Sequence, residues 1–74
     1  MDKDQAIHYA GILLDKLYGF RNRATGTKIH DANVMIAILD GYVRAANENR
    51  FPGAVQGLND GIQTVETFLS GQWR

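Results

Sequence analysis

The segment from Thr27 to Asn49 constrains the fold most, because its apolar residues fall on two helical rows instead of one. The first row repeats every three or four residues and consists of Ile29, Ala32, Ile36, Leu39, Val43 and Ala46. The second row lies beside it and consists of Met35, Ile38, Tyr42 and Ala45. A helix that is apolar on two sides needs two packing partners. We therefore expect this helix to be the central element, flanked by helices of its own chain or of a second copy.

Helical periodicity also predicts a helix on each side of this segment, from about residue 4 to 24 and from about residue 53 to 70. Between the first two helices, Gly26 is suited to a left-handed helix end and Thr27 to an N-cap, which leaves a very short turn. Asp31 is the competing cap and would lengthen the loop by four residues. A short turn makes the first two helices antiparallel.

These observations predict an all-α fold with a single helical domain over residues 1–74. We expect a small three-helix arrangement that runs up, down and up. It consists of an antiparallel helical hairpin, with helices at about 4–24 and 28–49, and a third amphipathic helix.

Because of three glycines, the sequence is compatible with two different first residues for the third helix. Gly53, Gly57 and Gly61 are four residues apart, so a continuous helix would carry them on one flank where another helix can approach closely. Each helical glycine costs about 1 kcal/mol relative to alanine. The alternative is therefore that the segment up to Asn59 is a loop and that the helix begins at a cap on Asn59 or Asp60.

The short length of the chain favours self-association. The hydrophobic core of a chain of 74 residues contributes only about 3–5 kcal/mol to stability, and without cysteine no disulfide adds to it. Small chains of this kind are commonly stabilised by oligomerisation. We expect a homo-oligomer whose interface draws on the second apolar row, the glycine flank and apolar residues on the polar side of the first helix. The candidate interface residues are Tyr9, Ile12, Met35, Ile38, Tyr42, Gly57 and Gly61.

A second candidate site lies at the end of the bundle that carries the first turn. The up, down and up arrangement gathers cations and aromatic side chains there, which suits phosphate binding and base stacking. The candidate ligand-binding residues are Tyr18, Arg21, Arg23, Lys28, His30, Trp73 and Arg74. The alternative explanation is that these cations only complement helix dipoles around a solvated turn.

No residue spacing predicts catalysis, a cofactor or a metal site. His8 and His30 belong to different predicted helices and have no motif spacing to a nucleophile or carboxylate. Asp40, Arg44 and Glu48, four residues apart, are most simply a ladder of ion pairs on the second helix. We therefore expect the chain not to be an enzyme.

The overall charge limits the classes of partner. Eight acidic residues balance eight basic ones, and the second helix is too apolar for a recognition helix, so we do not expect DNA as a partner. The opening Met1-Asp2-Lys3-Asp4 lacks the basic region of a secretory signal, and no apolar run reaches the length of a membrane span. We expect a cytoplasmic protein with no membrane contact.

Two functions are compatible with these expectations. The first is a small self-associating inhibitor or adaptor, of phage or accessory bacterial type, that acts by binding a partner protein. The second is an oligomeric protein that binds or sequesters a phosphorylated small molecule, such as a nucleotide, through the basic and aromatic end of the bundle.

Overall fold

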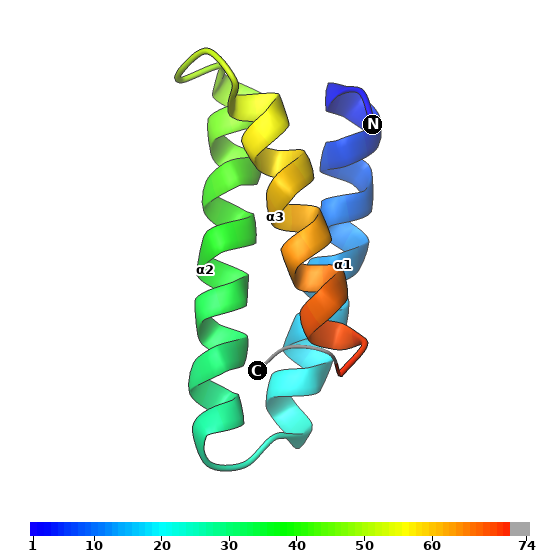
Figure 1. Ribbon diagram of the computed structural model, residues 1–74, viewed down its shortest axis with the longest axis vertical. Helices are drawn as coiled ribbons and strands as arrows, with labels where there is room; N and C mark the ends of the chain where they lie inside the picture. The colour runs from blue at the N-terminus through cyan, green and yellow to red at the C-terminus, as the bar shows by residue number, and fades with distance from the viewer. Residues whose placement is uncertain (72–74) are drawn as a thin grey trace.

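The computed structural model describes residues 1–71 and contains three helices: α1 (Lys3–Arg23), α2 (Thr27–Glu48) and α3 (Ala54–Leu69). The helices run up, down and up as an elongated bundle of 36 × 20 × 18 Å (Figure 1). This confirms the predicted all-α, three-helix fold. Oligomerisation stays a prediction, since a single chain is described.

Helix α1 begins at a complete capping box. The Asp2 carboxylate accepts a hydrogen bond from the backbone N–H of Gln5 at 2.9 Å, and the Gln5 side chain accepts one from the Asp2 backbone at 3.3 Å. These two bonds satisfy N–H groups that a helix start otherwise leaves without a partner. The helix ends at Arg23, and Ala24 already has an extended backbone.

The first turn is built differently from the expectation. Gly26 has a positive φ of 63° but an extended ψ of −138°, so it is not the left-handed end of α1. It precedes α2 as the capping residue, and Thr27, expected to be the cap, is the first helical residue. The alternative start at Asp31 is wrong, because this residue lies one full turn inside α2.

The second turn uses two left-handed residues. Asn49 ends α2 with a φ of 51°, and its N–H and that of Arg50 donate to carbonyls in the last turn of α2. Gly53 then adopts a φ of 85° directly before α3. Since α3 begins at Ala54, the alternative that the segment up to Asn59 is a loop is wrong.

The core contains only hydrophobic residues among those described. Its members are Ala6, Ala10, Leu13, Leu17, Ala32, Met35, Leu39, Ala45, Ala46, Ala54, Leu58, Ile62, Val65 and Phe68. Each helix packs against both of the others, and α2 takes part in the two most extensive of the three helix–helix contacts, as expected for the central element. The two apolar rows of α2 both contribute to this one core, and the second row packs against α3 in the same chain.

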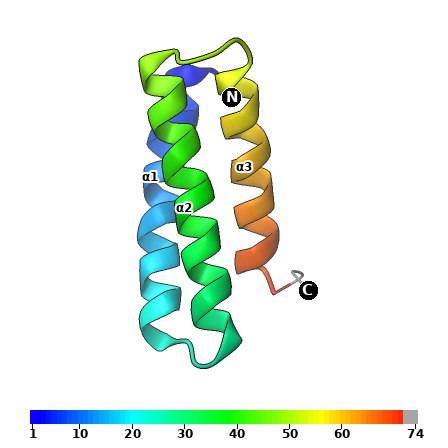
Figure 2. The same cartoon turned by 90° about the vertical axis from the view of Figure 1, so that its left-hand side faces the viewer.

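Helix α3 is shorter than its neighbours. It has 16 residues, whereas α1 has 21 and α2 has 22. The α1–α2 turn therefore extends beyond the last residue of α3, as two perpendicular views agree (Figures 1 and 2). We call this the hairpin end of the bundle.

Candidate interaction surface

An uncharged strip of α2 faces outward. Val34 and Ile38 retain 38% and 37% of their surface, and Ala37 and Gly41 beside them are also exposed. These positions follow one another at three- and four-residue steps, which places them on one side of the helix. Phe51, which is 46% exposed, follows in the loop after α2. We call Val34, Ala37, Ile38, Gly41 and Phe51 the α2 outer face.

The α2 outer face is slightly hollowed near the α2–α3 loop. A shallow groove of about 330 Å³ is lined by Ala37, Ile38, Gly41, Tyr42, Ala45, Arg50 and Phe51. Most of these side chains are apolar, which suits contact with another apolar surface.

Tyr42 closes the inner wall of this groove by packing on the glycines of α3. A Cβ added to Gly57 would lie 2.5 Å from Cε1 and 2.9 Å from Cδ1 of the Tyr42 ring. A Cβ on Gly61 would lie 3.5 Å from the other side of the same ring, at Cδ2. The two glycines therefore accommodate an aromatic ring within the chain. They are not a free surface for another helix.

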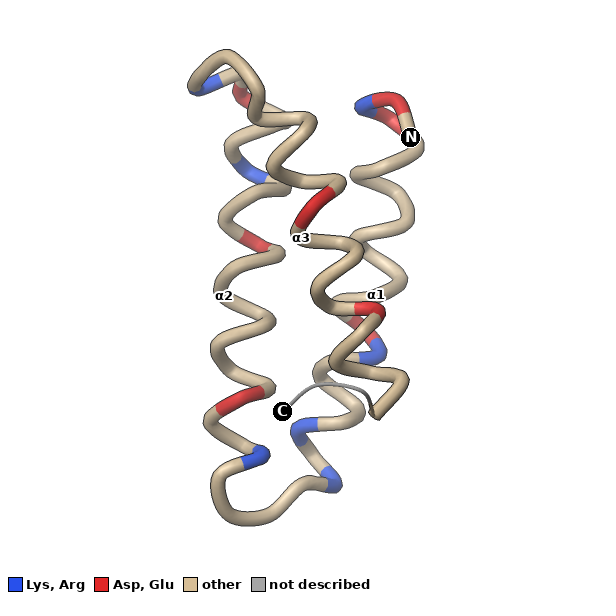
Figure 3. Tube along the Cα trace, viewed as in Figure 1, with Lys and Arg blue, Asp and Glu red and all other residues tan. Residues whose placement is uncertain are grey.

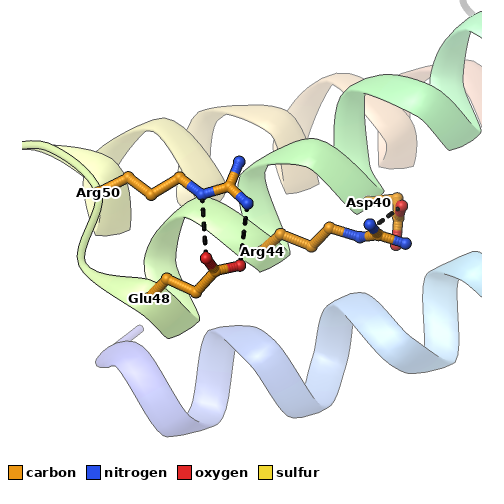
Figure 4. A network of polar contacts seen from close by, with 4 residues as sticks. All are labelled: Asp40, Arg44, Glu48 and Arg50. Atoms are coloured by element: carbon orange, nitrogen blue, oxygen red, sulfur yellow. Dashed lines mark hydrogen bonds and ion pairs between the residues drawn. The ribbon is translucent and has the colours of Figure 1, made fainter.

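Ion pairs line the charged end of α2. Arg44 Nε lies 3.1 Å from Asp40 Oδ2, which confirms the first pair of the predicted ladder (Figure 4). The second pair is wrong, because Glu48 pairs with Arg50 instead of Arg44. The Arg50 guanidinium donates to the two carboxylate oxygens of Glu48 at 3.3 and 3.0 Å.

The predicted interface residues are divided between core and surface. Met35 is 1% exposed and belongs to the core, so this candidate offers no surface to a partner. Tyr42, Gly57 and Gly61 pack against one another, as described above. Ile38 lies on the α2 outer face.

The two candidates on α1 also have different surroundings. Ile12 is 42% exposed, but the exposed residues around it on α1 are mostly polar or glycine: His8, Gly11, Asp15 and Lys16. Tyr9 is half-buried and joins α1 to α3, because its hydroxyl donates to Glu66 Oε2 at 2.6 Å. This hydrogen bond raises the pKa of the Tyr9 phenol, with smaller contributions from partial desolvation and from the negative charge of Glu66.

Within residues 1–71, the predicted ligand-binding residues are distributed over several features of the structure. Arg21 donates to Asn33 Oδ1 at 3.1 Å, and its guanidinium carbon lies 4.9 Å from the ring centroid of Tyr18. These two candidates therefore lie in contact at the seam between α1 and α2. His30 is exposed near the start of α2. Trp73 and Arg74 lie outside the described residues.

Arg23 and Lys28 line two separate hollows at the hairpin end, where basic positions gather around the turn (Figure 3). The first hollow is lined by Asp15, Lys16, Gly19, Phe20, Arg23 and Leu69. The second is lined by Phe20, Thr27, Lys28, Asp31, Phe68, Leu69 and Gly71. Phe20 and Leu69 border both, and Phe20 meets Phe68 edge to face with 5.0 Å between ring centroids. Each hollow thus combines apolar side chains with one acid, and the first has two cations whereas the second has one.

Sequence reasoning missed Val34 and Phe51 as surface candidates. Val34 lies on neither apolar row, although its spacing to Ala37, Ile38 and Gly41 is the signal of a third, weaker row. Phe51 lies between the second and third predicted helices, where helical periodicity assigns no surface. The loop geometry that places this ring beside α2 depends on the left-handed residues at 49 and 53.

No protein-family model matches the chain, and no curated protein and no solved structure matches it significantly. None of the three helices in the described part is both long enough and apolar enough to cross a membrane. Residues 1–71 contain no group of three or more His, Asp or Glu side chains placed to hold a metal ion. The fold thus defines the class of protein, a three-helix all-α bundle.

Proposed function

We propose that this chain is a non-enzymatic interaction protein that binds a partner protein through the α2 outer face. The observation that supports this proposal is the set of exposed, uncharged residues on one side of α2, Val34, Ala37, Ile38 and Gly41, extended by Phe51. Its side chains carry no nucleophile and no titratable group, so the face can contribute apolar burial but no bond chemistry. The partner that fits it is a helix with an apolar side, which such a shallow groove receives lengthwise.

In this proposal the chain is a small inhibitor or adaptor of phage or accessory bacterial type that works in the cytoplasm. Apolar contact of this kind gains free energy roughly in proportion to the area removed from water, at about 25 cal/mol per Å². A charge placed at Ile38, in the middle of the face, would have to be desolvated when the partner binds. It would therefore weaken binding far more than the loss of one apolar side chain.

A photo-crosslinking experiment tests the proposal. Ala37 is replaced by p-benzoylphenylalanine in cells that produce the chain, and the exposed Gln63 on α3 is replaced in a matched control. We expect a discrete crosslinked product from position 37 that is absent from position 63 and is lost when Ile38→Asp is added. No product from position 37, or the same products from both positions, would contradict the proposal.

The second candidate function is binding of a phosphorylated small molecule at the hairpin end. The observation that favours it is the pair of hollows that share Phe20 and Leu69, one lined by Arg23 and the other by Lys28. A cation next to an aromatic ring suits a nucleotide. Thermal melting in the presence of nucleotides tests this candidate: a stabilisation that Arg23→Ala and Lys28→Ala remove would support it, and no shift with any nucleotide would contradict it.

A further inference from the structure

The α2 outer face is the middle of a longer exposed row. This row has alternating spacings of four and three residues, and every member is exposed: His30, Val34, Ala37, Gly41, Arg44 and Glu48. Alternation of this kind places residues along the seam where two helices pack lengthwise. The middle of the row is apolar and small, whereas its ends are polar and unlike each other, with His30 at one end and Glu48 at the other.

Building on the proposed function, we infer that the partner is a second copy of this chain, whose α2 packs antiparallel against the first. The row is symmetric about Leu39, so a two-fold axis at the level of this residue brings matching positions together. Ala37 then lies opposite Gly41 of the second copy, and His30 lies opposite its Glu48. Each contact occurs twice.

Charge selects the antiparallel direction. In a parallel pair, the Arg44–Asp40 ion pair of one copy would face the same ion pair of the other, and the Glu48–Arg50 pair would do likewise, which brings like charges to close range. In the antiparallel pair, Glu48, which also binds Arg50 of its own chain, lies opposite His30, and the aliphatic part of Arg44 covers Val34. The dipoles of the two helices also point in opposite directions, which is the favourable arrangement for neighbouring helices. The face is therefore complementary to a reversed copy of itself.

The middle of the row allows close approach. A Cβ added to Gly41 would meet no atom within 4 Å, so the backbone there is open to the outside. With alanine opposite glycine, the two helix axes approach to the short end of the usual range of about 8–10 Å. Ile38 and Phe51 then lie beside the seam and add apolar area to the contact.

Disulfide trapping tests the direction and the register. The chain contains no cysteine, so His30→Cys and Glu48→Cys chains can be prepared separately and mixed under oxidising conditions. We expect a mixed disulfide between the two variants and no disulfide within either pure preparation. In the antiparallel pair the two copies of position 30 are about 27 Å apart along the helices, and a disulfide requires Cα atoms within about 7 Å. Disulfides in each pure preparation, or none in the mixture, would overturn the inference.

Sedimentation equilibrium tests the contribution of the face. The wild type should be a dimer at micromolar concentration, and Ile38→Asp should raise the dimer dissociation constant by about tenfold or more, equivalent to about 1.4 kcal/mol. Ile12→Asp is the matched control, since it makes the same change at an isoleucine of similar exposure on α1. We expect this control to leave the dissociation constant unchanged.

A second pair of variants separates packing between chains from folding. Gly41→Gln should weaken the dimer because of its bulk, yet raise the melting temperature of the diluted monomer because glutamine is the better helix former. Gly11→Gln should give only the increase in monomer stability, since Gly11 is also helical and also open to solvent. A dimer unaffected by Gly41→Gln would overturn the inference.

The outcomes also separate this inference from the proposed function. If the wild type is monomeric at millimolar concentration but position 37 crosslinks to a different protein, the inference of a dimer is wrong and the proposed interaction face is supported. If a dimer forms and only Ile12→Asp disrupts it, the interface lies on α1 and the inference is wrong. The crosslinking at position 37 then decides the proposed function independently.

Discussion

At the residue scale, the same amino acid has opposite roles at different positions of this chain. Gly57 is required by its surroundings, because the Tyr42 ring occupies the space where a Cβ would lie. Gly11 and Gly41 lie in helices with open space beside them. Glycine lowers helix stability unless a contact needs it, so of these three glycines Gly57 alone is explained by packing within the chain.

Alanine substitutions at these glycines should therefore change the free energy of unfolding in opposite directions. Gly57→Ala forces the Tyr42 ring to move and should lower the free energy of unfolding by about 1–3 kcal/mol. Gly11→Ala should raise the free energy of unfolding by about 0.5–1 kcal/mol, because alanine has the higher helix propensity and its Cβ meets no neighbouring atom. Urea denaturation of both variants measures the difference. Equal effects of the same sign would contradict the packing described for Tyr42.

The hydrogen bond from Tyr9 to Glu66 should make stability depend on alkaline pH. Because the Tyr9 pKa is raised in the folded state, the bond contributes fully below the ordinary phenol pKa of about 10, and its contribution is lost as the pH rises through the folded value. Denaturation across this range should show a decline in the wild type that is smaller in Tyr9→Phe. In an ultraviolet titration, Glu66→Gln should lower the pKa of the Tyr9 phenol.

At the element scale, the three helix starts differ in how they are capped. Only α1 has a side-chain cap, in which Asp2 and Gln5 bond reciprocally. Helices α2 and α3 follow glycines with positive φ and have no side-chain cap bond. Their starts depend on the conformation of the turn more than on a side chain.

Removing the α1 cap should have a measurable cost. Asp2→Ala should lower the free energy of unfolding by about 1 kcal/mol, because the backbone N–H of Gln5 loses its carboxylate acceptor. Asp4→Ala is the control, since Asp4 lies in the first turn without a cap bond and acts only on the helix dipole. Thermal denaturation compares them, and an equal loss in both would indicate a charge effect instead of a cap.

The turn before α2 allows a complementary prediction. Gly26→Ala should lower the free energy of unfolding by at least about 1 kcal/mol, because a residue with a Cβ is strained at a φ of 63° with an extended ψ. Thr27→Ala should have a small effect, since Thr27 is helical and not the cap. Urea denaturation of both variants tests this assignment, and a larger loss for Thr27→Ala would contradict it.

The number, type and order of helices were predictable, because Leu13, Leu39 and Leu58 belong to strong helical repeats that all face one core. The conformations of Gly26 and of Gly53 were not, since a glycine in a sequence is compatible with several backbone regions. The α2 outer face was only partly predictable. Ile38 was identified from its row, whereas Val34 belongs to a face that packing leaves uncovered, and this depends on where α3 lies.

At the scale of the whole molecule, the bundle buries apolar residues of all three helices in one core and still leaves a continuous uncharged strip outside. Helix α2, which carries this strip, runs along the long axis of the molecule (Figure 2). A second bundle docked there would lie side by side with the first. Self-association would thus broaden the molecule more than lengthen it.

The melting temperature of the wild type should accordingly rise with protein concentration. A dimer that dissociates on unfolding is stabilised by mass action, whereas the melting temperature of a monomer is independent of concentration. Ile38→Asp should remove the dependence and Ile12→Asp should retain it. Scanning calorimetry over a hundredfold range of dilution provides the measurement. A concentration-independent melting temperature of the wild type would contradict self-association.

The contact between Tyr42 and the glycines of α3 also limits how the helices can slide. Gly53, Gly57 and Gly61 are spaced by about one helical turn. A shift of α3 by one turn would therefore place the Tyr42 ring against Gly53 and Gly57 instead of Gly57 and Gly61. This alternative packing position is absent from the fold, because Gly53 has a left-handed backbone and lies before the first residue of α3. The turn conformation at a single glycine thus gives the bundle one register instead of two.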